Sequence, residues 1–427
     1  MISFEKRTRL QWNGLVGRLF KFSFPLPAIA FSFAATGARG QDAIQMFYAD
    51  KQLDSSKNAI SDPDYYNIKT GPVNLRFQST LQTEFTDNVN YTGTNRVADV
   101  YFQPAVNMRA YWPVTLNNSL FFNTGIGYTF YVKDSNLDHL DINPDSSLSF
   151  QMFVGGVAID VHDRFSMSED VSQSPTVSGS GNFVQIENTG GADATWDLNK
   201  LIVTAGYDHD WVNYVGSDFK SSDHNSDYLY SRAALTNSLV TTGVEAGTGL
   251  TYYEQNVFSD NAQANVGAFV QAPLSDHISL DAAAGFAGYF FTSSGTTADL
   301  SNILGYYANV SLNHRVNLWF NYSISGGRRL GEDTGVDLLQ LYFVNCQATF
   351  NLIHDLPISA QFIFEHGREY GGAGDTFNRY GVTVDMKYQI SERLSGAIEY
   401  AFWNRNSNVA SDSYVQNDVS LQLSYNF

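Results

Sequence analysis

Strict alternation of apolar and polar residues is the feature that most constrains the fold of this chain, and it runs from Gly71 to the last residue. In the final segment the odd-numbered positions from Val415 to Phe427 are mainly apolar. The even-numbered positions from Gln416 to Asn426 are polar. A period of two residues is typical of a β-strand with one apolar and one polar face. Because the pattern recurs throughout this region, the sequence predicts an all-β fold.

The connections between the alternating segments are short and long in turn, which predicts a repeated hairpin. Every short turn and the C-terminus must then lie on one side of the sheet, and every long connection on the other. This rule predicts about 18 antiparallel strands, with about 16 as the alternative if one hairpin between residues 160 and 200 is lost. The expected tight turns are 161–164, 274–278, 313–316, 353–357 and 390–394, and the expected long loops include 133–146, 216–227, 292–299 and 371–376. Gly155-Gly156, within the expected strand 147–160, is interpreted as a β-bulge.

Three features favour a transmembrane up-and-down barrel over a soluble sandwich. The predicted strands are about 11–16 residues long, against about 5–6 in globular proteins. Their polar face carries charges in mid-strand, which a dry core would have to pair and a water-filled lumen accepts. Aromatic side chains gather near strand ends, as at the two interfaces of an outer-membrane barrel: Tyr128, Phe130, Tyr400, Phe402, Tyr425 and Phe427. Because lipid leaves no backbone group unpaired, such a sheet must close on itself.

Composition and charge exclude other classes of protein. Charged residues make up 16% of the chain, below the roughly 25% of soluble domains, and aromatic residues make up 15%. The formal net charge of −18 disfavours a nucleic-acid partner, because such proteins need a basic surface. The single cysteine, Cys346, excludes a disulfide scaffold and a cysteine-based zinc site.

The first 40 residues are expected to be a cleaved signal peptide. A basic region comes first, an apolar stretch at 22–35 follows, and small residues precede Gln41. Pro25 and Pro27 interrupt the apolar stretch, which is also shorter than the roughly 20 residues of a membrane-spanning helix. Residues 41–71 are expected to form a periplasmic segment with a short helix near 43–53 or a plug, and residues 72–427 the barrel.

The inward-facing side chains are the candidate functional residues, because a barrel of about 16–18 strands leaves an aqueous channel. The predicted lumen charges are mixed but mainly acidic: Arg76, Glu84, Asp208, Asp210, Asp281, Arg329, Glu365, Asp385, Lys387, Glu399, Arg405 and Asp418. A narrow pore focuses such a field, which predicts a mild preference for cations or neutral solutes. Inward glycines such as Gly206 and Gly381 have two interpretations. In the first they relieve strand curvature or pack beneath neighbouring tyrosines such as Tyr253 and Tyr289, and in the second they make room for an inward-folded loop or for solute.

Nothing in the sequence points to an enzyme, a cofactor or a metal site. The chain contains no H-E-x-x-H, no G-x-S-x-G and no phosphate-binding loop. His209, between Asp208 and Asp210, forms the one acid–histidine cluster that could serve catalysis. Other histidines are placed in tight turns: His162, His277, His314 and His354.

Two segments resemble the beta-barrel porin type two family of bacterial outer-membrane proteins. Residues 71–75 (Gly-Pro-Val-Asn-Leu) and 84–89 (Glu-Phe-Thr-Asp-Asn-Val) are similar to the first strand and Asp-Asn loop of that family. Asn188 and the run 203–207 (Val-Thr-Ala-Gly-Tyr) are similar to its mid-barrel hairpin. The resemblance covers most of residues 70–427 and implies a porin-like barrel, often associated with exopolysaccharide production, without catalytic residues.

These observations predict a diffusion channel for small hydrophilic solutes in the outer membrane of a Gram-negative bacterium. The expected partners are outer-membrane lipids and lipopolysaccharide, the assembly machinery acting on the C-terminal strand, and small solutes or a polysaccharide. One alternative is an export conduit for an exopolysaccharide, which stacked aromatics in the lumen would favour, such as Trp319, Tyr253, Tyr289 and Trp403. Another is a structural or adhesive barrel that residues 41–71 plug.

Overall fold

The computed structural model describes residues 42–46, 48, 66–169, 174–237, 239–292, 295–296, 301–353, 356–371 and 374–427. All the described residues belong to one unit, Thr36–Phe427. The expected signal peptide, residues 1–40, lies outside the described residues. Within the described residues no helix has both the length and the apolar character needed to cross a membrane.

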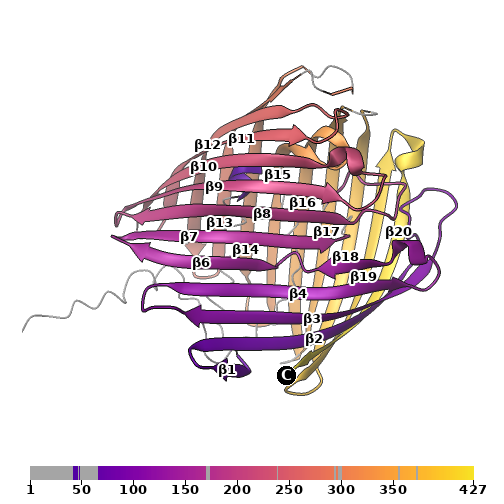
Figure 1. Ribbon diagram of the computed structural model, residues 1–427, viewed down its shortest axis with the longest axis horizontal. Helices are drawn as coiled ribbons and strands as arrows, with labels where there is room; N and C mark the ends of the chain where they lie inside the picture. Colours follow the sequence, from indigo (N-terminus) through magenta and orange to yellow (C-terminus); the bar gives the residue numbers. More distant parts are fainter. Residues whose placement is uncertain are drawn as a thin grey trace, which may run out of the picture. The chain divides into compact units, whose positions relative to one another are not determined.

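The described residues form one antiparallel sheet of 20 strands, of which 18 make up a closed barrel (Figure 1). β1 adds to the edge of β2. β5 and β6 are two pieces of one wall strand, because each pairs with β4 on one side and with β7 on the other. Pairing of β2 with β20, from Gln78 opposite Asn426 to Thr86 opposite Asp418, closes the ring. The prediction of an 18-stranded antiparallel barrel is therefore confirmed.

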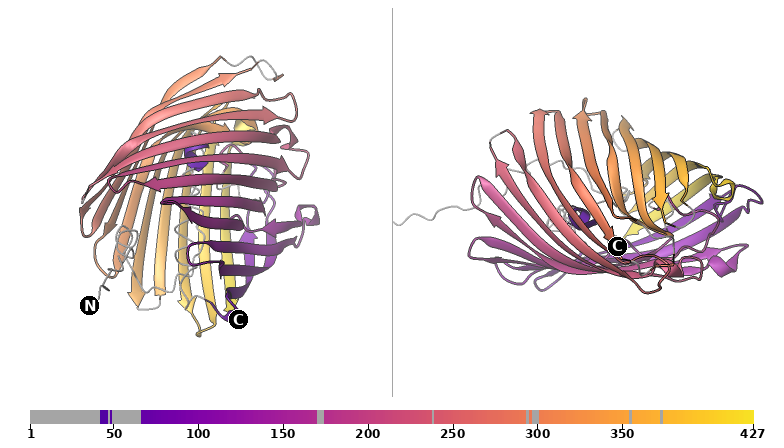
Figure 2. Two further views of the ribbon diagram at one scale, coloured as in Figure 1. Left: turned by 60° about the vertical axis from the view of Figure 1, so that its left-hand side comes forward. Right: turned by 90° about the horizontal axis from the view of Figure 1, so that it is seen from above.

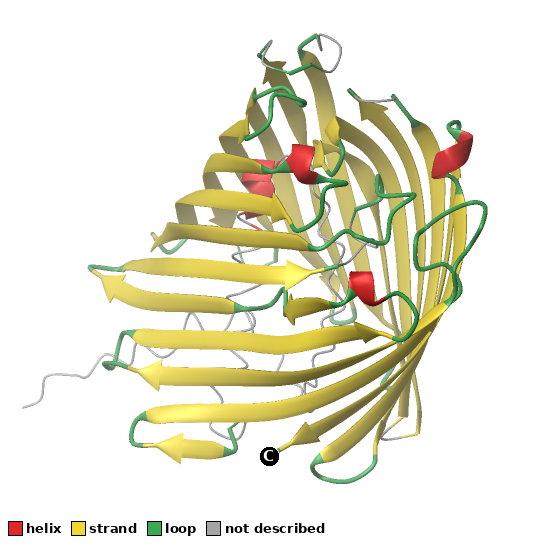
Figure 3. Ribbon diagram, turned by 45° about the vertical axis from the view of Figure 1, so that its right-hand side comes forward, coloured by secondary structure: helices red, strands yellow, loops and turns green. Residues whose placement is uncertain are grey.

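The strands are long and follow one another around the wall. Their bounds are β1 Ile68–Thr70, β2 Val73–Thr86, β3 Asp99–Pro113, β4 Ser119–Tyr131, β5 His139–Ile142, β6 Ser147–Val154, β7 Val157–Ser168, β8 Gln185–Asp197, β9 Leu201–Tyr214, β10 His224–Thr236, β11 Thr241–Tyr253, β12 Asn261–Ser275, β13 Ile278–Phe291, β14 Ile303–Arg315, β15 Phe320–Asp333, β16 Val336–Ile353, β17 Leu356–Tyr370, β18 Thr376–Gln389, β19 Leu394–Ser407 and β20 Tyr414–Asn426. Short 3-10 helices lie in three of the long connections (Figure 3): η2 Ser135–Leu137, η3 Lys220–Ser222 and η4 Ala410–Asp412.

The period of two in the sequence becomes the two faces of the barrel wall. On β20 the side chains of Val419, Leu421 and Leu423 are exposed on the outer face. The side chains of Gln416 and Ser424, on the other parity, are buried inside. Apolar side chains can remain exposed on the outer face because lipid replaces water there, whereas the inner face carries the polar groups.

The tight turn expected at 161–164 is wrong, and so is the interpretation of Gly155-Gly156 as a bulge. β6 and β7 are joined by the two-residue turn Gly155-Gly156, whose φ angles are 57° and 90°. A two-residue hairpin whose twist matches that of its strands needs positive φ at both positions, which glycine adopts without steric cost. The segment 161–164 therefore lies inside β7, and His162 is a wall residue.

Other expected connections shift in smaller ways. The expected loop 133–146 contains η2 and β5, so part of it belongs to the wall. The turn after β14 occupies 316–319, later than the expected 313–316, because β14 continues to Arg315. In the expected turn 353–357, residues 354–355 lie outside the described residues.

Candidate functional site: the lumen of the barrel

The candidate functional site is the inner face of the wall, where alternate residues of each strand point. Within one strand, Asp385 and Lys387 alternate with the exposed outer side chains of Val384, Met386 and Tyr388. All the predicted lumen charges occupy positions of this kind, opposite in parity to the exposed apolar residues of their strand: Arg76 and Glu84 on β2, Asp208 and Asp210 on β9, Asp281 on β13, Arg329 on β15, Glu365 on β17, Asp385 and Lys387 on β18, Glu399 and Arg405 on β19, and Asp418 on β20.

Four of these acids lie close in register across β18, β19, β20 and β2. Asp385 is directly opposite Glu399. Glu399 and Glu84 lie opposite Ser420 from its two sides, and Asp418 is the next inward residue of the same strand. We call Glu84, Asp385, Glu399 and Asp418 the acidic stripe. It presents several carboxylates to any solute on this side of the lumen.

Arg405 is the centre of a buried polar cluster at the loop end of β19. Its Nη2 donates to Glu369 Oε1 at 3.0 Å and to Asp375 Oδ2 at 2.8 Å. Its Nε donates to the carbonyl of Pro175 at 3.1 Å, and its Nη1 donates to the carbonyl of Asp412 at 2.7 Å. Two carboxylates therefore neutralise this predicted lumen charge, and the guanidinium ties the β7–β8 connection to the wall.

Glu365 is likewise part of a buried ion pair. Arg379 Nε donates to Glu365 Oε2 at 2.6 Å, and both side chains are buried. The guanidinium carbon of Arg379 lies 4.6 Å from the ring centroid of Trp403, which adds a cation–π contact. Glu365 and Arg405 are therefore both held in buried ion pairs.

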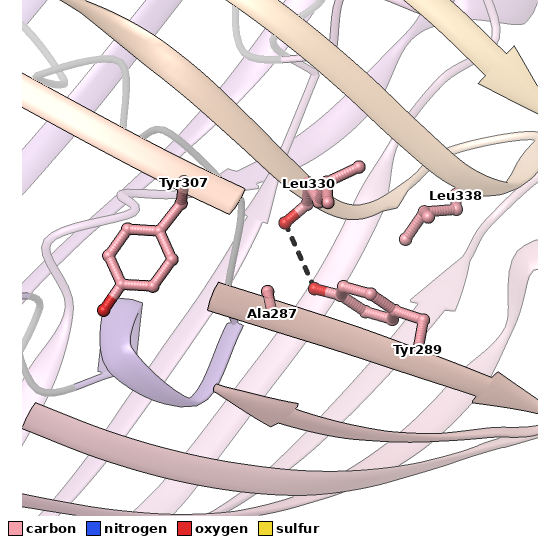
Figure 4. Packing of buried hydrophobic residues seen from close by; sticks show 5 residues of the cluster. All are labelled: Ala287, Tyr289, Tyr307, Leu330 and Leu338. Carbon is pink, nitrogen blue, oxygen red and sulfur yellow. Dashed lines mark hydrogen bonds between the residues drawn. The ribbon is translucent and has the colours of Figure 1, made fainter. Parts of the chain in front are cut away.

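The end of the β15–β16 hairpin separates from β14 and folds inward, while β16 stays paired with β17 as far as Leu338; we call residues 329–337 the inner hairpin. The register of β15 with β14 ends at Ala308 opposite Arg328, although β15 and β16 stay paired up to their turn. The adjacent residues Leu338 and Leu339, at the last pairs of β16 with β17, are both buried, so neither side chain is exposed on the outer face at this end of the hairpin. The Tyr289 hydroxyl of β13 donates to the Leu330 carbonyl at 3.1 Å (Figure 4). Arg329, a predicted lumen charge, is buried within this tip.

Loops from the opposite wall hold the inner hairpin at its turn, Thr334-Gly335. Thr176 Oγ1, in the β7–β8 connection, donates to the Thr334 carbonyl at 2.8 Å. The hydroxyls of Tyr214 and Thr334 lie 2.9 Å apart, and the Gly335 amide donates to Ser222 Oγ at 2.9 Å. The inner hairpin and the β7–β8 connection therefore meet inside the barrel and narrow its lumen.

A short helical segment, residues 42–46 and 48, also lies inside the ring of strands (Figure 2). Asp42 Oδ2 accepts hydrogen bonds from Gln263 Nε2 at 3.1 Å and from the Tyr289 hydroxyl at 3.3 Å. Ala43 is fully buried and lies over Gly247, where an added Cβ would be 2.8 Å from the Ala43 methyl. The helix expected at 43–53 therefore contacts the inner wall in its described part, while residues 49–65 lie outside the described residues.

Tyr48 extends this contact to a charged pair on the wall. Its hydroxyl donates to Glu245 Oε2 at 3.3 Å, and the Tyr307 hydroxyl donates to Glu245 Oε1 at 2.9 Å. Burial, together with the negative charge of Glu245, raises the pKa of Tyr48 to about 12. The phenol therefore stays protonated and able to donate to the carboxylate at neutral pH.

At most inward glycines an aromatic ring of a neighbouring strand packs against the backbone, in the space that a Cβ would occupy. A Cβ at Gly381 would lie 2.4 Å from the Trp403 ring, and one at Gly206 would lie 2.3 Å from the Tyr230 ring. This outcome corresponds to the first of the two interpretations, although the rings belong to residues other than the expected Tyr253 and Tyr289.

The aromatic residues that would favour polysaccharide export do not form a solute-facing stack. Trp319 lies in the 316–319 turn, half exposed. Tyr253, Tyr289 and Trp403 are buried against protein groups. The observation named for an export conduit is therefore missing from the described lumen.

The acid–histidine cluster expected around His209 is divided by the wall. Asp208 and Asp210 point inward, whereas His209 points outward and lies 3.0 Å from Asp227 on the outer face. Inside, Asp208 Oδ1 instead contacts His162 Nε2 at 2.8 Å. The expected His209 cluster is wrong, and sequence reasoning missed His162 because it was placed in a turn.

The predicted girdle residues lie on the outer face, but only those of β4 and of the C-terminus lie near a strand end. Tyr400 and Phe402 lie in the middle of β19, so the expectation is wrong for this pair. The Tyr128 and Phe130 rings are 4.5 Å apart on β4, and the Tyr425 and Phe427 rings are 5.4 Å apart at the C-terminus. On β19 the Tyr400 hydroxyl donates to Asn417 Oδ1 at 2.8 Å, and Phe402 follows on the same face.

The likeness to solved structures extends over most of the barrel. OpdQ of Pseudomonas aeruginosa matches with a TM-score of 0.51 and 10% identity over 84% of this chain and 100% of that one. OccK2 (OpdF) of the same species matches with a TM-score of 0.50 and 9% identity over 83% and 97%. The outer membrane protein OpdK has a TM-score of 0.48 and 10% identity over 83% and 99%. No protein-family model and no curated protein matches the chain. At these identities the likeness shows the fold.

Proposed function

We propose that this protein is a non-enzymatic outer-membrane channel for the passive diffusion of small hydrophilic solutes. The observation that carries the proposal is the closed barrel of 18 strands with an apolar outer face and a charged inner face. A barrel of this size leaves an aqueous lumen unless loops fill it. The similar folds of OpdQ and OccK2 support the assignment to porins.

A mild cation preference follows from the acidic stripe. Its four carboxylates line one side of the lumen, while Glu365 and Arg405 are neutralised in pairs. Carboxylates that line a narrow lumen raise the local cation concentration. The solute would thus be a neutral or cationic small molecule.

The test is single-channel conductance of the purified protein in a planar bilayer under a potassium chloride gradient. We expect steady openings with a cation-biased reversal potential. In the double variant Glu399→Gln/Asp385→Asn the cation bias of the reversal potential should decrease. In the control Asp276→Asn, in the β12–β13 turn, the reversal potential should be unchanged. Anion selectivity in the unmodified protein would reject the charge assignment, and silence of a folded barrel would reject the open channel.

A second candidate function is a barrel closed by its N-terminal segment. The contacts of Asp42, Ala43 and Tyr48 with the inner wall favour it. Deleting residues 41–71 should then raise the conductance severalfold. In an open porin the same deletion would leave the conductance nearly unchanged, so one recording distinguishes the two functions.

The finer assignment to the beta-barrel porin type two family is also a proposal, and its Asp-Asn motif supports it. Asn88 Nδ2 donates to the carbonyls of Thr92 at 2.8 Å and Val415 at 2.9 Å. The Asp87 carboxylate accepts from the Asn417 amide at 2.8 Å and from its side chain at 2.7 Å. These bonds join β2 and its loop to β20, so the motif would serve barrel closure. Recognition of the Phe427 end by the assembly machinery, and contact with lipopolysaccharide, belong to the same proposal.

A further inference from the structure

Three side chains with metal-binding atoms converge on the inner wall between β7 and β8. Asp160 and His162 both point inward from β7, with the exposed Val161 between them. Asp193 of β8 lies directly opposite Asp160 in register. One ligand atom from each of the three side chains lies within 4.8 Å of the other two. This spacing allows one ion to contact all three.

Asp208 fixes the orientation of the imidazole from the next strand, β9. His162 lies opposite Gly191 of β8, and Gly191 lies opposite Asp208. Because glycine has no side chain, the Asp208 carboxylate can occupy that place; a Cβ on Gly191 would lie within 1.8 Å of Asp208 Oδ1. His162 Nε2 is 2.8 Å from Asp208 Oδ1, and Asp208 is fully buried.

This contact determines which ring nitrogen can bind a cation. A ring nitrogen that donates its hydrogen to a carboxylate leaves the other nitrogen with its lone pair, which is the arrangement common to metal-ligating histidines. Here Nε2 donates to Asp208, so Nδ1 is the ligand atom, and it lies 3.5 Å from Asp160 Oδ1. Two tetrahedral ligands, each about 2.1 Å from a zinc ion, are about 3.4 Å apart.

The donor set defines the class of cation. We propose that Asp160, His162 and Asp193 bind a divalent transition-metal ion of the zinc class on the lumen side of the wall, with Asp208 as the positioning residue. One imidazole and two carboxylates suit such an ion, and water completes its coordination. Ser149 Oγ lies 3.0 Å and 2.9 Å from the two oxygens of Asp160, which orients that carboxylate from β6.

The ion would cross-link a weak part of the wall. On its other side β7 pairs with β6 only up to Arg164 and with β5 only at Met167, because the strand between β4 and β7 is broken in two. An ion held by Asp160, His162 and Asp193 joins β7 to β8 beside this break. Metal binding should therefore raise the resistance of the barrel to unfolding.

The test is calorimetric titration of Zn²⁺ into the purified, chelator-treated protein carrying a histidine-free affinity tag. We expect one equivalent to bind and the midpoint of thermal unfolding to rise. Asp193→Asn, a change at a half-buried side chain, should weaken binding at least 100-fold, and Asp208→Asn about 10–100-fold. The control His209→Ala removes an outward histidine and should bind normally.

Cobalt spectra separate a ligand from a positioning residue. With Co²⁺ bound, Asp208→Asn should keep the visible absorption bands of the unmodified protein at a higher metal concentration. His162→Ala should change their position, because a nitrogen ligand is lost. Absence of stoichiometric Zn²⁺ binding, or binding that Asp193→Asn leaves intact, would overturn the proposal.

Discussion

Replacing Arg405 by methionine tests whether the buried polar cluster holds the lumen loops in place. Methionine keeps most of the side-chain length but removes all four hydrogen bonds, the two to Glu369 and Asp375 and the two to the carbonyls of Pro175 and Asp412. Both carboxylates would remain buried without their cation. Removing one partner of a buried ion pair costs about 3–5 kcal/mol. We expect the free energy of unfolding to fall by that amount.

The measurement is urea-induced unfolding of the refolded barrel, followed by tryptophan fluorescence. A matched control is Arg393→Met, which changes an exposed arginine of the β18–β19 turn and should have almost no effect. Adding Asp375→Asn to Arg405→Met should recover part of the loss, because one buried charge disappears with it. Proteases should also cleave the 174–184 connection faster in the Arg405 variant. A loss below about 1 kcal/mol would refute the reasoning, since exposed pairs contribute no more than that.

Two further substitutions test the glycines. Gly381→Ala places a methyl group 2.4 Å from the Trp403 ring and should lower the free energy of unfolding by about 1–3 kcal/mol in the same experiment. In the control Gly396→Ala the nearest contact of the methyl group would be at 3.4 Å, so the loss should be close to zero. Equal losses in the two variants would show that the Trp403 ring moves aside. Gly156→Ala forces a methyl group onto a backbone with φ of 90° and should cost about 1–2 kcal/mol, whereas an unchanged midpoint would mean that the turn adjusts.

The fold could be predicted because its main determinant is a local pattern. A period of two residues assigns each side chain to one face, and a membrane barrel repeats that rule in every strand. The alternation around Val419, Leu421 and Leu423 was therefore enough to place β20 and its outward face. The same rule gave the parity of Asp385 and Glu399.

The departures from alternation carry the information that the pattern missed. Leu338 and Leu339 are adjacent apolar residues, which indicates burial on both faces of the strand. Both are buried although β16 still pairs with β17 there, because the hairpin begins to fold inward at this point. The polar segment 161–164 resembles the other short turns, and the sequence therefore predicts the turn there and a bulge at Gly155-Gly156. A two-residue hairpin turn needs positive φ at both of its central residues, and two consecutive glycines meet this requirement.

The contacts between side chains of different strands could not be predicted, because they depend on the register between the strands. A slip of one residue would exchange the two faces of a strand. His209 is adjacent to Asp208 and Asp210 in the sequence, yet its side chain lies on the outer face of the wall and theirs lie on the inner face. His162 is 46 positions away from Asp208 and contacts it across Gly191.

In a barrel wall, neighbours in sequence face opposite sides, so a run of reactive residues cannot form a site. A site must instead combine residues two apart on one strand with residues opposite them on the next strands. Asp160 and His162 satisfy the first condition, and Asp193 satisfies the second. The acidic stripe obeys the same rule, with Asp385 and Glu399 opposite each other. Both the channel charge and the metal-binding cluster therefore follow from the geometry that makes the wall, once the register of each hairpin is known.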